Sequence, residues 1–266
     1  GRNTGTLSGV SVTSATVSGA GRYVGGLVGS NTGTIVQASV TSVSVTSSSD
    51  RVGGLVGSNT GTVSGSSVTG AAVTGTIYVG GLLGQNNSGA LVVGSRVVGG
   101  SVTGTTNFIG GVVGDNSGQV SSSTLSGTTV TGTYTADEHL GGIAGRNTRT
   151  LSGVSVTSAT LSGAGDYVGG LVGSNTGTIV QASVTDVSVT SAKTNVGGLA
   201  GRNALVINDA SVSGATVTST YTGAAYVGGL VGYNTGTLSS VGVTSATVAG
   251  SSVTDRVGGL AGQNSG

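Results

Sequence analysis

The strongest constraint on the fold of this chain is a Gly-Gly pair that recurs along its whole length of 266 residues. The pair is followed by two aliphatic residues and a third glycine, as in residues 25–29. The pairs lie 27 to 31 residues apart and begin at Gly25, Gly53, Gly80, Gly110, Gly141, Gly169, Gly197, Gly228 and Gly258. A period of this length indicates a repeat architecture in which each unit buries its apolar face only against its neighbours.

Apolar residues within each unit alternate with polar ones and then change parity. Val40 and Val43 are three residues apart, whereas Val43 and Val45 are two apart. Alternation at two is typical of a strand with one buried face, and a gap of three requires a corner in the chain. Glycine and β-branched residues are also poor helix formers. We therefore predict an all-β fold, a β-solenoid (parallel β-helix) of about nine coils of 27–31 residues with no capping domain.

A longer period is superimposed on the short one, because residues 1–47 are nearly repeated at residues 145–191. The sequence begins within one unit and ends within another, and neither end has the atypical repeat that caps a free-standing solenoid. We expect residues 1–266 to form a single β-solenoid repeat domain that is a segment of a longer chain.

Composition narrows the function. The chain has no Cys, so disulfides and cysteine-based metal sites are excluded. Its net charge of +1 gives no electrostatic basis for nucleic-acid binding, and no apolar run is long enough for membrane insertion. We expect no cofactor, no metal and no catalytic residue, because the eight acidic residues are scattered and the calcium-binding Gly-Gly-x-Gly-x-Asp repeat is absent.

An asparagine recurs in every unit and shares its parity with the buried aliphatic positions. We expect its amide to point inward at a corner and to hydrogen-bond to the same amide one coil along, since buried amides need partners. This structural Asn ladder comprises Asn3, Asn31, Asn59, Asn116, Asn147, Asn175, Asn203, Asn234 and Asn264, with either Asn86 or Asn87 in the unit that has an extra residue.

The string from Gly25 to Ile35 resembles the GLUG motif, and it recurs with small changes in every unit. Units that depart from it include one with Arg149 and one with Leu205 in place of the glycine that follows the asparagine. The resemblance implies a β-helical rod in a large bacterial secreted or cell-surface protein, such as an adhesin similar to filamentous haemagglutinin. It implies an extracellular or cell-surface location and transfers no catalytic residue.

A column of mostly aromatic residues precedes the Gly-Gly pairs. Exposed tyrosines beside a groove are a candidate surface for stacking on sugar rings, while the alternative is a set of partly buried corner side chains. The aromatic members are Tyr23, Tyr78, Phe108, Tyr167 and Tyr226. Acidic residues precede the charged members of the column, and we expect surface ion pairs there. The single histidine, His139, is expected to be a solvated loop residue.

Outward-facing threonines form a second candidate surface. Regular Thr-x-Thr rows resemble the faces of ice-binding solenoids, although Ser and Thr are also ordinary polar strand residues. The candidate residues are Thr46, Thr74, Thr103, Thr131, Thr190 and Thr218.

Differences in unit length fall just before the aromatic column, so specific binding is expected at that edge. We predict a non-enzymatic structural or adhesive rod, a stalk or filament segment of a bacterial surface or secreted adhesin. Two alternatives stay open, an ice-binding solenoid and a carbohydrate-binding β-helix module. The expected partner is an unidentified glycan, protein or ice surface, with self-association end to end or side by side.

Overall fold

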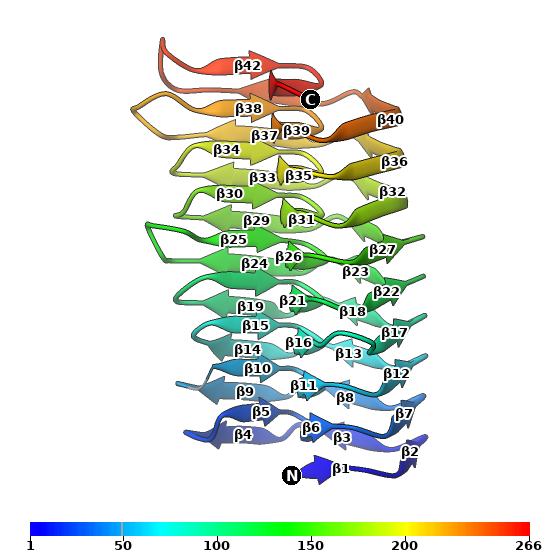
Figure 1. Ribbon diagram of the computed structural model, residues 1–266. Coiled ribbons are helices and arrows are strands. Elements are labelled where there is room, and N and C mark those ends of the chain that lie inside the picture. The colour runs from blue at the N-terminus through cyan, green and yellow to red at the C-terminus, as the bar shows by residue number, and fades with distance from the viewer. Residues whose placement is uncertain (49) are drawn as a thin grey trace.

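The chain winds into a stack of parallel β-strands, with the N-terminus at one end of the stack and the C-terminus at the other (Figure 1). The computed structural model describes residues 1–48 and 50–266, and the described residues contain no helix. One coil illustrates the path. It consists of β5 (Tyr23–Gly25), β6 (Val28–Asn31), β7 (Thr34–Val36), β8 (Ser39–Thr41) and β9 (Ser44–Ser47). The predicted β-solenoid of about nine coils is confirmed.

Four sheets run along the stack, and we name each by its outstanding feature. The asparagine sheet has ten strands, which are β1 (Arg2–Asn3), β6, β11 (Val56–Asn59), β16 (Leu83–Asn86), β21 (Val113–Asn116), β26 (Ala144–Asn147), β31 (Val172–Asn175), β35 (Ala200–Asn203), β39 (Val231–Asn234) and β43 (Ala261–Asn264). The aromatic sheet has nine, which are β5, β10 (Arg51–Gly53), β15 (Tyr78–Gly80), β20 (Phe108–Gly110), β25 (His139–Gly141), β30 (Tyr167–Gly169), β34 (Asn195–Gly197), β38 (Tyr226–Gly228) and β42 (Arg256–Gly258).

The other two sheets carry the Ser/Thr-rich outer faces. The threonine sheet has nine strands, which are β4 (Thr16–Gly19), β9, β14 (Ala72–Gly75), β19 (Ser101–Gly104), β24 (Thr129–Gly132), β29 (Thr160–Gly163), β33 (Ser188–Ser191), β37 (Thr216–Ser219) and β41 (Thr247–Ala249). The bent sheet has fifteen, which are β2 (Thr6–Ser8), β7, β12 (Thr62–Ser64), β17 (Leu91–Val93), β22 (Gln119–Ser121), β27 (Thr150–Ser152), β3 (Ser11–Thr13), β8, β13 (Ser67–Thr69), β18 (Arg96–Val98), β23 (Thr124–Ser126), β28 (Ser155–Thr157), β32 (Thr178–Thr185), β36 (Val206–Ser213) and β40 (Thr237–Thr244).

Strands pair in register with the equivalent strand of the next coil, so like residues form columns. Val40 pairs with Val68, and Val45 pairs with Val73. These valines are almost fully buried, and the aliphatic columns form a continuous core through the stack. One coil has too few apolar residues to exclude water alone, so the columns stabilise the molecule only when coils stack.

The predicted corners are produced by residues in the left-handed backbone region. Gln37, between β7 and β8, has φ of 51°, and Ser42, between β8 and β9, has φ of 52°. Their equivalents in other coils are also Gly, Ser, Gln or Asp with positive φ, as is typical of such positions. The gap of three residues between core valines therefore corresponds to one residue spent on the turn.

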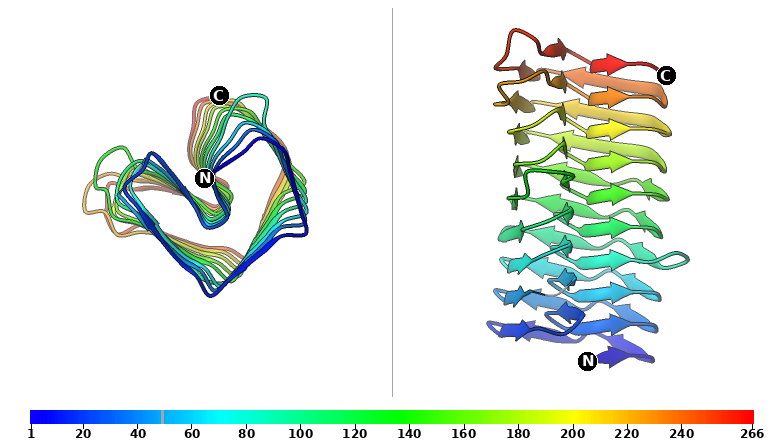
Figure 2. Two further views of the ribbon diagram at one scale, coloured as in Figure 1. Left: turned by 90° about the horizontal axis from the view of Figure 1, so that it is seen from below. Right: turned by 60° about the vertical axis from the view of Figure 1, so that its left-hand side comes forward.

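Seen along its axis, the backbone outline has a re-entrant notch (Figure 2, left). The notch lies between the aromatic sheet and the asparagine sheet, because the chain reverses at the Gly-Gly-Leu segment that joins β5 to β6. Residues from the outward faces of these two sheets line hollows along the notch, so the two sheets border a furrow that follows the long axis of the stack. We call this furrow the axial groove.

Candidate functional site: the axial groove

Glycine at three positions per coil allows the backbones at the base of the groove to touch. A Cβ atom on Gly57, in β11, would lie 2.7 Å from the backbone nitrogen of Val24, in β5. A Cβ on Gly25 would lie 2.8 Å from the nitrogen of Gly57, and one on Gly26 would overlap the carbonyl oxygen of Gly54 in the next coil. Real Cβ atoms do not approach backbone atoms this closely. The repeated glycines are therefore required for the notch itself.

The first residues of the aromatic-sheet strands form one wall of the groove. The Tyr78 and Phe108 rings are stacked with centroids 5.4 Å apart and an interplanar angle of 11°. The ring of His139 lies 4.9 Å from that of Phe108 and 4.8 Å from that of Tyr167. The Arg51 guanidinium lies between two tyrosines, 5.2 Å from the ring centroids of both Tyr23 and Tyr78.

This stacking decides how the aromatic column can bind a ligand. The faces of Tyr78, Phe108 and His139 are turned toward neighbouring members of the column, along the axis of the stack. Phe108 is also nearly buried, at 8% exposure, whereas Tyr23 is 39% exposed. The column therefore presents mainly ring edges and hydroxyl groups to the groove, which favours the alternative of partly buried corner side chains over a platform of exposed tyrosine faces.

The opposite wall is a column of polar residues from the asparagine sheet. Its members are in register with one another, namely Arg2, Ser30, Ser58, Gln85, Asp115, Arg146, Ser174, Arg202, Tyr233 and Gln263. Several contacts join this wall to the aromatic column. Toward the C-terminal end, the rings of Tyr226 and Tyr233 lie 5.5 Å apart, and Arg256 donates a hydrogen bond to Gln263. Two further contacts lie nearer the N-terminal end. Arg51 donates a hydrogen bond from Nε to Gln85, and the guanidinium of Arg146 lies 4.3 Å from the centroid of the Phe108 ring.

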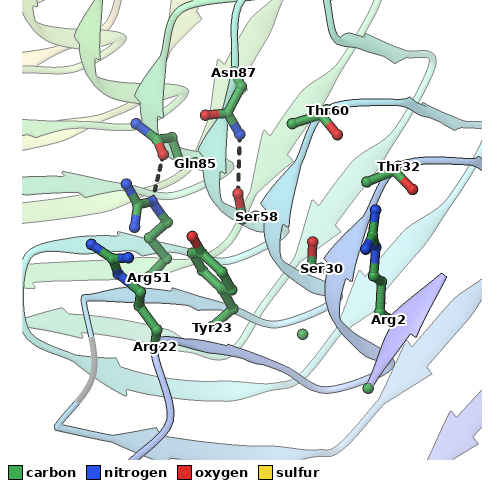
Figure 3. Close-up of a pocket in the computed structure, with 12 residues that line it drawn as sticks. Arg2, Arg22, Tyr23, Ser30, Thr32, Arg51, Ser58, Thr60, Gln85 and Asn87 are labelled. Carbon is green, nitrogen blue, oxygen red and sulfur yellow. Dashed lines mark hydrogen bonds between the residues drawn. The ribbon is translucent and has the colours of Figure 1, made fainter. Parts of the chain in front are cut away.

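The groove contains two hollows, one toward each end of the stack. The N-terminal hollow, of about 590 Å³, is bordered by Arg2, Arg22, Tyr23, Arg51 and Gln85, among others. In Figure 3, Arg2 lies across this hollow from Arg22, Tyr23 and Arg51. The C-terminal hollow, of about 440 Å³, is bordered by Tyr167, Asn195, Arg202, Tyr226, Tyr233 and Gln263.

Between the hollows lies an ion pair of a buried aspartate and a half-buried arginine. Asp115 is fully buried and accepts a hydrogen bond of 2.8 Å from Nε of Arg146 and one of 3.0 Å from Nε2 of Gln85. The bond to Asp115 raises the pKa of the Arg146 guanidinium, so this arginine stays charged. In the sequence, a lone Asp beside Gly114 is the one feature that marks this pair.

His139 is not a solvated loop residue, contrary to expectation. It is the first residue of β25 and is only 9% exposed, because its ring continues the aromatic column. Burial lowers the pKa of His139, although the nearby Asp137, 3.1 Å from Nε2, partly opposes that shift. Burial likewise raises the pKa of the Tyr167 hydroxyl, which keeps it protonated.

The acidic residues before the column do not form the expected ion pairs with their neighbours in sequence. Glu138 is buried and accepts hydrogen bonds from the backbone N–H groups of Tyr134, Ala164 and Gly165. Asp255 similarly accepts from the N–H of Ala225. These carboxylates hold the loops between the threonine and aromatic sheets, where backbone amides need acceptors.

The expected asparagine column is a continuous hydrogen-bonded ladder. In each step the Nδ2 of one asparagine donates to the Oδ1 of the next, at 2.6 to 3.0 Å. Asn86, not Asn87, is the ladder member in its coil. Two extra residues follow it, because Leu91, five residues after Asn86, pairs with Thr62, three residues after Asn59. This difference in length lies after the asparagine sheet, contrary to the expectation that all such differences fall just before the aromatic column. Nδ2 in most steps also donates to the carbonyl two residues later, as from Asn31 to Gly33, so the ladder closes the corner after β6. Except for the exposed terminal member Asn264, the ladder asparagines are buried, and their amides hydrogen-bond to one another.

The candidate threonines lie on the outward face of the threonine sheet, away from the groove. Thr46, Thr74, Thr103 and Thr131 are consecutive members of one column. Thr190 and Thr218 belong to the same column, but Ser162 precedes them and Ala249 follows them. The row is in register but chemically mixed.

The family comparison identifies the repeat. The model of the GLUG motif matches residues 20–50 and 164–195. The chain carries the GLUG motif. Each match runs from the loop before an aromatic-sheet strand, through the glycines at the base of the groove and the ladder asparagine, to the threonine sheet. The GLUG repeat is thus one coil of the β-solenoid, and the chain is a structural repeat protein. No curated protein matches this chain.

The part of the chain that the structure describes contains no helix long and apolar enough to cross a membrane. Within residues 1–48 and 50–266, no group of three or more His, Cys, Asp or Glu side chains is arranged to hold a metal ion.

Proposed function

We propose that this chain is a non-enzymatic, adhesive rod segment of a bacterial cell-surface or secreted protein. The observation that carries the proposal is the uninterrupted repetition of one coil, with an aliphatic core, a buried amide ladder and backbone contacts at glycine. Such a stack transmits force along its length and presents a long lateral surface. Among the described residues, the buried Glu138, Asp115 and His139 serve a loop, an ion pair and the aromatic column, and they form no nucleophile–base pair with one another.

The location is tested on intact cells of the bacterium that produces the protein, using antibodies raised against the purified chain. We expect labelling without permeabilisation and loss of the label after brief external proteolysis. Labelling that requires permeabilisation would overturn the proposed location. A cytoplasmic protein in the same cells provides the control for lysis.

The non-enzymatic part is tested on the purified chain with a panel of neutral and acidic polysaccharides. We expect no release of reducing or unsaturated ends over a prolonged incubation. Release that disappears on substitution of Glu138, the buried carboxyl group with the raised pKa, would identify a catalytic site and overturn this part of the proposal.

A further inference from the structure

The charged residues of this chain are few, and most of the cations lie on the axial groove. The chain has nine Lys and Arg residues. Six of the arginines lie in the groove walls or in the loops at its rim, namely Arg2, Arg22, Arg51, Arg146, Arg202 and Arg256. The low charge of the remaining surface makes this concentration a distinct local feature although the net charge is only +1.

Four of these cations are not neutralised by a carboxylate. Arg146 is paired with the buried Asp115, and Arg22 lies 4.0 Å from Asp50. Across residues 1–48 and 50–266, Arg2, Arg51, Arg202 and Arg256 have no Asp or Glu oxygen within ion-pair distance. The only acidic side chain that forms part of a wall is therefore the one already paired.

The groups around these arginines are hydrogen-bonding groups. Tyr23, Ser30, Ser58, Thr60 and Asn87 border the N-terminal hollow, and three tyrosines, Asn195 and Gln263 border the C-terminal one. Guanidinium, phenol and amide groups together suit an anionic, hydroxyl-rich ligand, because guanidinium binds carboxylate or sulfate with charge-assisted hydrogen bonds.

The positions of the cations indicate an extended ligand that lies along the stack. Coils are about 4.8 Å apart, and most cations in the two walls are separated by two coils, or about 10 Å. Arg51 and Arg256 come from the aromatic sheet, whereas Arg2 and Arg202 come from the asparagine sheet. A linear polysaccharide with an anionic group on alternate sugars can meet cations from both walls.

We propose that the axial groove binds an anionic polysaccharide, through guanidinium and hydroxyl groups rather than through stacking on exposed ring faces. A single-stranded nucleic acid is disfavoured, because its binding depends on free aromatic faces, and the inner rings of this column cover one another. This inference rests on the proposed adhesive function and adds to it the class of ligand that the rod would bind.

Binding is measured by calorimetry on the purified chain with polygalacturonate, dextran sulfate, neutral dextran and poly(dT). We expect at least one of the two anionic polysaccharides to bind, with an affinity that falls as salt is raised, and neutral dextran not to bind. The carboxylated and sulfated polymers distinguish the two kinds of anion. Stronger binding of poly(dT) than of both, or binding of none, would overturn the proposal.

A matched pair of double variants tests the location of the site. Arg51→Gln with Arg202→Gln removes one cation from each hollow, and we expect the affinity to fall at least tenfold. Arg96→Gln with Arg149→Gln removes the same charge from exposed positions outside the groove and should change affinity less than twofold. Circular dichroism and melting of both variants verify the fold. An equal loss of affinity in the two double variants would show that charge attraction is non-specific and would overturn the proposed location of the site.

This test uses purified protein, so its failure is distinguishable from failure of the proposed surface location. Surface labelling without polysaccharide binding would support the proposed surface rod and overturn the proposed ligand. Polysaccharide binding without surface labelling would support the binding site in the groove and overturn the proposed adhesive role.

Discussion

At the scale of single residues, glycine and a few buried polar groups decide the shape of each coil. The glycines at the base of the groove are required because a Cβ atom there would overlap the backbone of the adjacent strand or coil. Glu138, in contrast, contributes through the space that its side chain fills. It fills a space lined by Gly132, Gly163 and Gly165, and its carboxylate satisfies backbone amides in two consecutive loops.

Gly170→Ala should severely destabilise the protein. Its added Cβ would overlap the carbonyl oxygen of Gly198 in the next coil, and the backbone on both sides is held by sheet hydrogen bonds. We expect a loss of more than about 3 kcal/mol of unfolding free energy, measured by chemical denaturation. Gly242→Ala is the control, because a Cβ there has no atom within 4 Å. Equal stability of the two variants would refute the close-contact explanation.

Glu138 should make stability fall as the pH rises through neutrality. Burial raises its pKa from 4.5 to about 7, so the folded protein binds this proton more tightly than the unfolded chain. The contribution of this protonated carboxyl group to the unfolding free energy is complete below pH 4.5 and is lost as the pH rises through 7. Its size is on the order of 3 kcal/mol.

The neutral isostere Glu138→Gln isolates this effect. We expect Glu138→Gln and wild type to melt at similar temperatures near about pH 5 and the variant to melt higher near about pH 8. Asp209→Asn, which changes an exposed carboxylate, should show no such divergence. A constant difference between Glu138→Gln and wild type over this range would contradict the prediction.

At the scale of elements, the columns matter more than individual strands. The strands of a coil are only two to eight residues long, and they are stabilised by pairing with equivalent strands above and below. The asparagine ladder is one such column, and each internal member is both donor and acceptor. Removing one member therefore takes one hydrogen bond from each of the two neighbouring amides, which keep only their bonds within the coil and to the next amide.

Asn147→Ala should cost about 2–4 kcal/mol, because it deprives Asn116 of an acceptor and Asn175 of a donor. Chemical denaturation measures the loss. Asn87→Ala is the matched control, since Asn87 is a half-buried asparagine outside the ladder and its substitution leaves the ladder intact. A smaller cost for Asn147→Ala than for Asn87→Ala would show that the ladder contributes little to stability.

Sequence periodicity predicted the columns well and the groove poorly. The parity of Asn31 with Leu27 and Ile35 placed the amide inward, and the gap between Val40 and Val43 located a corner. The notch could not be predicted, because it depends on the direction in which the Gly-Gly segment turns. The position of His139 before a Gly-Gly pair places it in the aromatic column, but its burial could not be predicted, because it depends on how the rings of Phe108 and Tyr167 pack against it.

At the scale of the whole molecule, each coil pairs its strands only with the coils before and after it. Stability is then a sum over coils and their interfaces, without contacts between distant parts of the chain. Loops of different length are accommodated at the edge between the threonine and aromatic sheets, where they project from the stack (Figure 2, left). The coil itself keeps its register past every such loop.

Deletion of one whole coil should therefore be tolerated. Removing residues 176–203 takes out the 28 residues from one ladder asparagine to the next and joins Asn175 to Ala204. We expect a folded β-rich protein by circular dichroism with a small decrease in melting temperature. Removing residues 176–189, half as many, would place core residues opposite surface residues, and we expect that variant not to fold. Folding of both deletions would contradict a strict coil register.

The in-register columns also have an evolutionary consequence. Because the upper surface of every coil matches the lower surface of every other, a duplicated stretch of gene that encodes whole coils can be inserted without redesign of its neighbours. The near-identity of residues 1–47 and 145–191 fits such an event. Unequal recombination can thus adjust the reach of the molecule, while point substitutions at the rim diversify what it contacts.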